Sequence, residues 1–229
     1  MMRRWLEGWR LCRGLERVIE YPDAYAAVLR LPGRERELFA RTDDAATVER
    51  LATGLPEDTW LTVTTRTADR TTTQLLAAGT HPFPEPKTLM STDLHQHPQP
   101  HQPRDAAQAG GGYWLEFTSD GPLDYVRLLA PGGAVAARGM VATVGPDAVM
   151  HDIQTDPAHR RRGLGSVVMG ALAGRAVQRG ARTGLLMATT DGFHLYRKLG
   201  WAAEATMVTA SGARLGPVRG DLGPVLTGG

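Results

Sequence analysis

The sequence predicts an α+β fold in which a mostly antiparallel sheet is flanked by helices, and two observations support this class. Residues 113–155 alternate short apolar stretches with turn-forming Pro, Gly and Asp, a pattern typical of antiparallel strands joined by tight turns. Residues 156–210 then alternate a helical apolar period with short buried-strand stretches. A strand meander followed by strand, helix, strand, helix and strand places helices on the faces of a mixed sheet.

The elements of the C-terminal half follow from these patterns. Strands are predicted over 113–117, 126–130, 134–144 and 149–155, with turns at Pro131-Gly132-Gly133 and Gly145-Pro146-Asp147, then a helix over 165–178, a strand over 184–189, a short helix over 192–199 and a strand over 201–210. The first four strands form the expected meander, and the remaining elements form the helix-covered part of the sheet.

The N-terminal part carries weaker signals. A helix is predicted over 45–53, a strand over 60–64, a helix over 71–78 that ends before Gly79, and a short strand over 88–90. This part of the sequence contains no phosphate-binding loop and no catalytic motif.

Composition predicts the domain organisation. Residues 95–112 contain Pro, Gln and Gly but no large apolar side chain, so they are expected to form a solvated linker or long loop. This linker would separate an N-terminal α/β domain over 1–94 from a C-terminal domain over 113–210. Residues 211–229 are rich in Gly and are expected to form a partly disordered tail.

Composition also excludes several classes of protein. A net charge of +2 over 229 residues is not the polybasic surface of a nucleic-acid-binding protein. Cys12 is the single cysteine, which excludes an intrachain disulfide and a cysteine zinc site. Residues 1–13 have no signal-peptide apolar core, and no stretch is long enough to span a membrane, so we expect a cytoplasmic protein. The spacing of His95, His97 and His101 fits no closed metal site, so no metal is expected.

Residues 155–166 (TDPAHRRRGLGS) are the segment most informative about function, because a strand ends there, a basic loop follows and a helix begins. The first amides of a helix have no intrahelical acceptor and lie at the positive end of its dipole, which favours anions. Gly163 and Gly165 allow close approach to the backbone, and Ser166 could cap the helix or bind a phosphate oxygen. The segment is neither a Walker loop nor a dinucleotide fingerprint, and a plain solvated basic loop is the alternative.

Residues 160–165 (RRRGLG) resemble the Gln/Arg-x-x-Gly-x-Gly/Ala signature of the GCN5-related N-acetyltransferase (GNAT) superfamily. Two further features agree with this resemblance: a strand of the Ile153-Gln154-Thr155 type precedes the loop, and residues 195–201 (LYRKLGW) resemble the LYxKLGF ending of the superfamily. The resemblance covers 113–210 and implies a central twisted, mostly antiparallel sheet flanked by helices.

The resemblance implies acetyl-CoA as co-substrate, without a metal. Loop residues would bind its pyrophosphate, and the backbone of the preceding strand would bind its pantetheine. These two groups are Arg160, Arg161, Arg162, Gly163, Leu164, Gly165 and Ser166 for the loop, and Ile153, Gln154 and Thr155 for the strand. The sequence departs from the superfamily at Thr189, where an asparagine often binds pantetheine, while Gly192 stands at a position often held by a small residue. Threonine can still donate one hydrogen bond.

The resemblance further implies that Tyr196 acts as general acid and protonates the departing thiolate. A phenol pKa of about 10 lies above that of a thiol, about 8.5, which suits this transfer. The alternative is that Tyr196 is a core aromatic. His151 is the candidate general base, with Asp152 on the opposite face of a regular strand. Glu116 and Asp120 are alternative bases; a buried structural role for His151 and a chain of water molecules also remain open.

The implied activity is transfer of an acetyl group to a primary amine of a small molecule or peptide, by direct attack in a ternary complex. A CoA-binding sensor without turnover and an acyltransferase for a longer acyl-CoA are the alternatives. The expected partners exclude nucleic acid and membrane, and the frequent dimerisation of GNAT proteins leaves a homodimer open. The N-terminal half is expected to be a degenerate GNAT-like domain, or else to supply the helices that shape the acceptor site or a lid.

Overall fold

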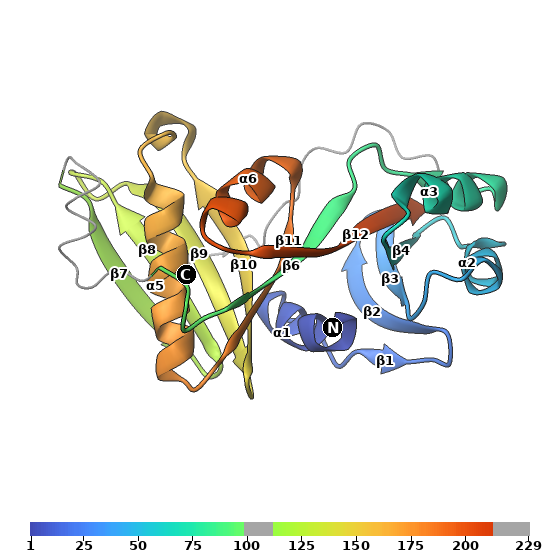
Figure 1. Cartoon of the computed structure of the whole chain (residues 1–229), viewed down its shortest axis with the longest axis horizontal. Helices are drawn as coiled ribbons and strands as arrows, with labels where there is room; N and C mark the ends of the chain where they lie inside the picture. Colours follow the sequence, from blue (N-terminus) through green and yellow to red (C-terminus); the bar gives the residue numbers. More distant parts are fainter. Residues whose placement is uncertain (99–111, 213–229) are drawn as a thin grey trace. The chain divides into compact units, whose positions relative to one another are not determined.

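The computed structural model describes residues 1–98 and 112–212, which divide into two compact units (Figure 1). Unit 1 consists of Met1, Arg3–Cys12 and Met90–Glu204, and unit 2 consists of Met2, Arg13–Leu89 and the residues from Ala205 onward. The units have different bounds from the zones seen in the composition, because each end of the chain groups with the other half of the sequence. Most of the expected linker and tail lies outside the described residues.

The sheet of unit 1 carries the meander predicted from the sequence. Its strands lie in the order β6 (Lys87–Asp93), β11 (Thr183–Ala188), β10 (Asp147–Thr155), β9 (Val135–Val144), β8 (Leu123–Leu129) and β7 (Trp114–Asp120). Strands β7 to β10 are antiparallel neighbours, whereas β10 and β11 are parallel. A parallel pair needs a crossover connection, which the chain provides with the helix between β10 and β11.

The crossover helix, α5 (Leu164–Gln178), packs on β8, β9 and β10 (Figure 1). It buries an apolar stripe that includes Leu164, Val168 and Leu172 in the main core of unit 1. Gly139 on β9 makes this close packing possible, since a Cβ built there would lie 3.0 Å from both Cγ1 of Val168 and Cδ1 of Leu172. Helix α6 (Thr190–Lys198) follows β11.

Helix α1 (Met2–Cys12) was not predicted, although its apolar residues recur at helical spacing. Trp5, Leu6 and Trp9 are buried, and the rings of Trp5 and Trp9 stack with centroids 5.3 Å apart. Arg4 holds the helix to β10 through Nε, which donates to Oδ2 of Asp147 at 2.8 Å. The N-terminal helix is therefore part of unit 1.

The strands of unit 2 lie in the order β1 (Ile19–Glu20), β2 (Ala24–Leu31), β3 (Arg34–Ala40), β4 (Thr59–Thr65) and β12 (Ala202–Ser211), of which the residues from Ala205 onward belong to this unit. Strands β3 and β4 are parallel and joined by α2 (Ala45–Ala52), and α3 (Ala68–Ala77) follows β4. The C-terminal residues of β12 pair with β4 and with β5 (His81–Pro82). Val48, Leu61, Val63, Leu75 and Val208 form the core of this unit.

The predicted α+β class, with a mostly antiparallel sheet flanked by helices, is confirmed. Each helix and strand predicted from the sequence is present, with ends shifted by a few residues. Strands β1, β2 and β3 were missed, and in β3 the charged residues Arg34, Glu35, Arg36 and Glu37 interrupt the apolar alternation. The segment 95–112 was expected to be a solvated linker, but His97 within it is buried: it is 4% exposed and packs edge-on against Trp201.

Candidate functional site

The parallel strands β10 and β11 pair over only part of their length. Their register runs from Asp147 opposite Thr183 to Val149 opposite Leu185, and within the described residues no pair continues it. Strand β10 nevertheless extends to Thr155 and β11 to Ala188. Beyond Val149 the two strands are therefore no longer in register with each other. A strand stretch that its neighbour does not pair with can receive an extended ligand by main-chain hydrogen bonds.

A β-bulge interrupts β10 in this unpaired stretch. His151 lies opposite Met140 and Gln154 opposite Arg138, so two residues of β10 face Gly139 alone. Asp152 lies in this bulge with φ +52°. The regular alternation expected for His151 and Asp152 is therefore broken, although the expected strand is present.

The carboxylate of Asp152 is already engaged. Its Oδ1 accepts from Nε2 of Gln154 at 2.6 Å, and its Oδ2 lies 3.2 Å from Nη2 of Arg138. Both carboxylate oxygens of Asp152 are thus held by neighbouring side chains, so the residue has a structural role at the bulge.

The loop after β10 prepares the start of α5. A single turn, η1 (Pro157–His159), begins with Asp156, whose carboxylate accepts from the Ala158 N–H at 2.8 Å. Arg161 and Gly163 then adopt left-handed backbone conformations, with φ of +65° and +76°. These two reversals turn the chain from the strand into the helix. A left-handed arginine is uncommon and costs free energy, which other contacts of the loop must offset.

The first amides of α5 are available for an anion. Gly163 is the N-cap residue, and its carbonyl accepts from the N–H of Ser166 at 3.0 Å. Among the described residues, neither the N–H of Leu164 nor that of Gly165 donates to a backbone carbonyl. Ser166 is in the first turn and does not cap the helix, so that alternative is wrong. The site retains the features of an anion cradle.

Gly165 brings three of the predicted segments together. A Cβ built at Gly165 would lie 3.0 Å from Cδ2 of Leu195 on α6 and 3.7 Å from Oγ1 of Thr155 at the end of β10. The start of α5, the end of β10 and the helix that carries Tyr196 therefore meet at one glycine.

The three arginines of the loop have different surroundings. All three are exposed, and Nε of Arg160 donates to the carbonyl of Thr155 at 3.4 Å. Arg162 instead donates from Nη1 to the hydroxyl of Tyr113 at 2.9 Å. Sequence analysis assigned no role to Tyr113, and nothing in the local sequence indicates this contact.

Thr189 and Gly192 form the start of α6. Thr189 is its N-cap, and Oγ1 accepts from the N–H of Gly192 at 3.2 Å. A Cβ at Gly192 would lie 3.0 Å from Cε2 of Tyr196, so the small residue leaves room for the tyrosine ring. Capping uses the threonine oxygen as acceptor and leaves its O–H able to donate.

Tyr196 is a core aromatic by position. Its side chain is 8% exposed and its ring lies 6.1 Å from that of Trp201. Burial raises the pKa of its phenol to about 12, since the phenolate would be poorly solvated. The hydroxyl therefore stays protonated at neutral pH, as a general acid requires. A role in the core and a role as acid are compatible here.

The other candidate bases lie elsewhere. Glu116 and Asp120 belong to β7, which β8 and β9 separate from β10. At roughly 4.8 Å between neighbouring strands, that places them about 14 Å from β10. Glu116 also forms an ion pair with Arg127, at 3.0 Å. The expectation that these two acids are alternatives to His151 is therefore not supported by their place in the sheet.

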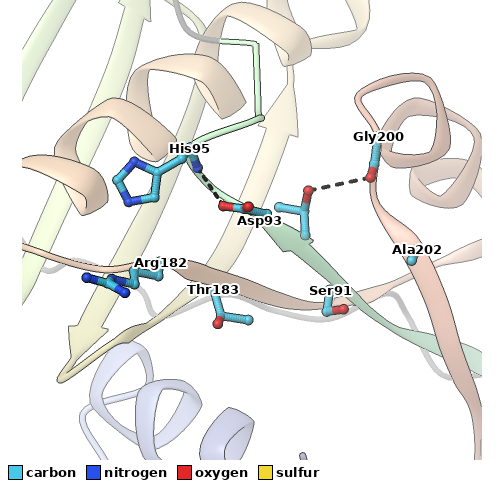
Figure 2. Close-up of a pocket in the computed structure, with 8 residues that line it drawn as sticks. Ser91, Asp93, His95, Arg182, Thr183, Gly200 and Ala202 are labelled. Carbon is cyan, nitrogen blue, oxygen red and sulfur yellow. Dashed lines mark hydrogen bonds between the residues drawn. The ribbon is translucent and has the colours of Figure 1, made fainter.

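Figure 2 shows a cavity at the other end of β11. It measures about 760 Å³ and is lined by Ser91, Thr92, Asp93, His95, Arg182, Thr183, Gly200 and Ala202. Oδ1 of Asp93 accepts from the backbone N–H of His95 at 3.0 Å, so this carboxylate stabilises a turn (Figure 2). None of the predicted site residues lines this cavity.

Among the described residues, no group of three or more His, Cys, Asp and Glu side chains could hold a metal ion. His101 lies outside the described residues. In the same part of the chain, no helix is both long and apolar enough to cross a membrane.

Comparisons with known proteins agree with this geometry. Residues 134–209 match the family model described as FR47-like protein, a segment that runs from β9 into β12 and includes the whole loop. A GCN5-related N-acetyltransferase from Kribbella flavida is similar over 91% of this chain and 93% of its own, with 18% identity and a TM-score of 0.57. The chain has the GNAT fold. The predicted resemblance to that superfamily is confirmed.

Other solved GNAT structures agree. A GCN5-related N-acetyltransferase from Sphaerobacter thermophilus matches over 82% of this chain and 76% of its own, at 14% identity and a TM-score of 0.57. A tandem GNAT protein from the clavulanic acid biosynthesis pathway, solved without acetyl-CoA, matches over 84% and 79%, at 16% identity and a TM-score of 0.53. No curated protein matches the chain.

Unit 2 repeats the order of elements around the GNAT loop but lacks its features. Parallel strands β3 and β4 flank α2 as β10 and β11 flank α5, and α3 follows as α6 does. Asp44, however, caps α2 with its own carboxylate, which accepts from the Thr47 N–H at 3.0 Å. The hydrogen bonds from Thr42 and Thr47 lower the pKa of Asp44 to about 2, so an anion already occupies this helix start.

Proposed function

We propose that the chain is an acetyl-CoA-dependent N-acetyltransferase that acetylates a primary amine of a small molecule or peptide. One observation carries the proposal: β10 stops pairing with β11 after Val149, and the glycine-containing start of α5 follows directly. An extended thioester and its phosphates need these two features side by side. The FR47-like match covers both.

In this proposal the loop binds the pyrophosphate and β10 binds the pantetheine. The free N–H groups of Leu164 and Gly165, with the exposed Arg160 and Arg161, supply donors and positive charge. The side chains of Ile153, Gln154 and Thr155 matter less than their backbone, which the missing ladder partners leave available. A backbone N–H of this strand would also polarise the thioester carbonyl.

The reaction is a direct transfer in a ternary complex. The amine nitrogen attacks the carbonyl carbon of the thioester, the carbon–sulfur bond breaks, and the thiolate takes the proton of the Tyr196 hydroxyl. The nitrogen loses its second proton as it becomes an amide, and this proton returns to the Tyr196 oxygen. His151, or water at that position, accepts the proton that the ammonium form of the acceptor must lose. Holding amine and thioester in place supplies much of the rate.

For unit 2 we propose the role of a degenerate GNAT-like domain that contributes to the acceptor site or acts as a lid. The repeated order of elements and the tandem GNAT relative support this. The Asp44 cap accounts for the missing cofactor loop. A cytoplasmic location, and a homodimer as the form in solution, remain part of this proposal.

A CoA-binding sensor without turnover is the second candidate. Thr189 in place of the usual asparagine, and its use as a helix cap, favour weaker pantetheine binding. An acyltransferase for a longer acyl-CoA is the third. Both share the cofactor site and differ in what happens at the acyl group.

The test measures free-thiol release from acetyl-CoA with amines of four classes: aminoglycosides, polyamines, amino acids and peptides. Release that depends on one amine class supports the proposal. Tight CoA binding by calorimetry without release with any amine favours the sensor, and release only from longer acyl-CoA favours the third candidate. Absence of CoA binding overturns all three.

A further inference from the structure

We propose that Tyr113 is a positioning residue for the cofactor loop. Its hydroxyl fixes Arg162 and sets the tautomer of His159 for phosphate binding. This inference rests on the proposed function, because it assigns the part of the site that holds the CoA phosphates. Tyr113 directly precedes β7, at the end of the sheet where β10 ends.

The tyrosine is anchored independently of the loop. It is 4% exposed and belongs to the main core of unit 1. Its hydroxyl makes two hydrogen bonds, one from Nη1 of Arg162 at 2.9 Å and one with Nδ1 of His159 at 2.8 Å. The two rings meet edge to face, with centroids 5.6 Å apart. A rigid core residue thus contacts the loop at two points.

The hydrogen bond from Arg162 constrains the tyrosine hydroxyl. A guanidinium is a donor only, so the tyrosine oxygen must accept from Arg162. This leaves the phenol proton available for Nδ1 of His159, and in our proposal the hydroxyl donates to that nitrogen. With Nδ1 as acceptor, neutral His159 carries its proton on Nε2, and this ring nitrogen becomes an N–H donor. The partly exposed histidine presents that donor in a loop of three arginines.

The contacts also bracket Arg160 and Arg161. His159 and Arg162 stand three residues apart, and Arg160 and Arg161 lie between them. Holding both ends restricts the backbone of Arg161, which keeps its left-handed conformation at φ +65°. A loop fixed before the ligand arrives loses less entropy on binding, which raises affinity.

The test removes only the hydroxyl. We expect Tyr113→Phe to weaken binding of CoA about tenfold by calorimetry, since the ring still fills the core but neither loop residue is held. Tyr125→Phe is the matched control, because Tyr125 is a partly buried tyrosine of β8 in the same unit and should leave CoA affinity unchanged. With an amine substrate, the loss should appear in KM for acetyl-CoA and not in kcat.

A second readout follows the histidine directly. ¹⁵N NMR of the His159 ring at pH 8 should show the Nε2–H tautomer in the parent chain and a mixture of tautomers in Tyr113→Phe. If Tyr113 only stabilised the core, a Tyr113→Phe variant that melts at the same temperature as the parent would show the same ¹⁵N signal for the His159 ring.

The outcomes separate the two proposals. If the parent chain binds CoA and Tyr113→Phe binds it equally well, the positioning role is wrong while the proposed function stands. If the ring tautomer is unchanged in the variant, the role is equally contradicted. If the parent chain binds no CoA, the proposed function fails, and the role of Tyr113 in phosphate binding fails with it.

Discussion

Gly165 at the start of α5 and Leu195 on α6 are in such close contact that a Cβ on the glycine would lie 3.0 Å from Cδ2 of the leucine. The contact joins the loop that would bind phosphates to the helix that carries Tyr196. A larger side chain at Gly165 must therefore displace Leu195 or extend toward the free amides of the loop.

Gly165→Asp should abolish CoA binding, with affinity lower by at least about a hundredfold. The carboxylate would repel the pyrophosphate and occupy the donors meant for it. Isothermal calorimetry with CoA measures the effect, and Gly165→Ala serves as control because it adds the Cβ without charge. Equal loss in both variants would show that crowding, not charge, decides.

Tyr196→Phe should lower turnover about a hundredfold and leave CoA affinity within a few-fold, since only the proton donor is removed. Steady-state rates and calorimetry on the same preparation separate the two effects. Full activity of the variant would exclude Tyr196 from the reaction and leave it a core residue.

The raised pKa of Tyr196 has a consequence for stability. A phenol that titrates near 10 when unfolded and at about 12 when folded gives stability that is present below pH 10 and lost between pH 10 and 12. Denaturant unfolding of Tyr196→Phe should therefore depend less on pH in this window than unfolding of the parent. Parallel curves for the two proteins would mean that burial does not perturb this phenol.

Cys12 should be inert in the folded chain. It is 4% exposed, and burial raises the pKa of its thiol to about 12. Iodoacetamide at pH 8 should modify it only after the chain unfolds, because the thiolate is the reactive form. Mass spectrometry of native and urea-treated samples measures this, and rapid labelling of the native chain would contradict the buried position of α1.

Gly139→Ala should destabilise unit 1 by about 1–3 kcal/mol, because the new methyl meets Ile153 at 2.5 Å and Val168 and Leu172 at 3.0 Å. Equilibrium unfolding gives the value. Adding Ile153→Val should recover part of the loss by removing the closest methyl group. A double variant no more stable than Gly139→Ala would place the strain elsewhere.

The parts predicted from sequence are those whose signals are local. The loop at 160–165 and the helix start after it occupy consecutive positions, so their geometry could be expected from glycine and helix-dipole chemistry alone. The strands of the unit 1 meander could be predicted because clear turn-forming residues separate them in the sequence. Fold class and superfamily followed from these two signals.

The parts that were missed depend on distant residues. Tyr113 lies 49 positions before Arg162, and no pattern around either residue indicates the hydrogen bond between them. The bulge at Asp152 arises where Gly139 faces two residues of β10, so it cannot be seen in one strand alone. Strand β3 was missed because Glu37 is buried by pairing with Arg34 and Thr62, contacts that make a charged residue compatible with an interior strand.

The pairing of β4 with β12 constrains how the chain can be made. Thr64 of β4 finds Met207 as its partner only after more than a hundred further residues have been synthesised. At about 5–20 residues per second, the ribosome leaves this edge of the N-terminal sheet unpaired for several seconds. The pairing of β4 with β12 therefore cannot form until the C-terminal half of the chain has been synthesised. The two fragments produced by a cut within 95–112 would each lack a strand or a helix of their own unit.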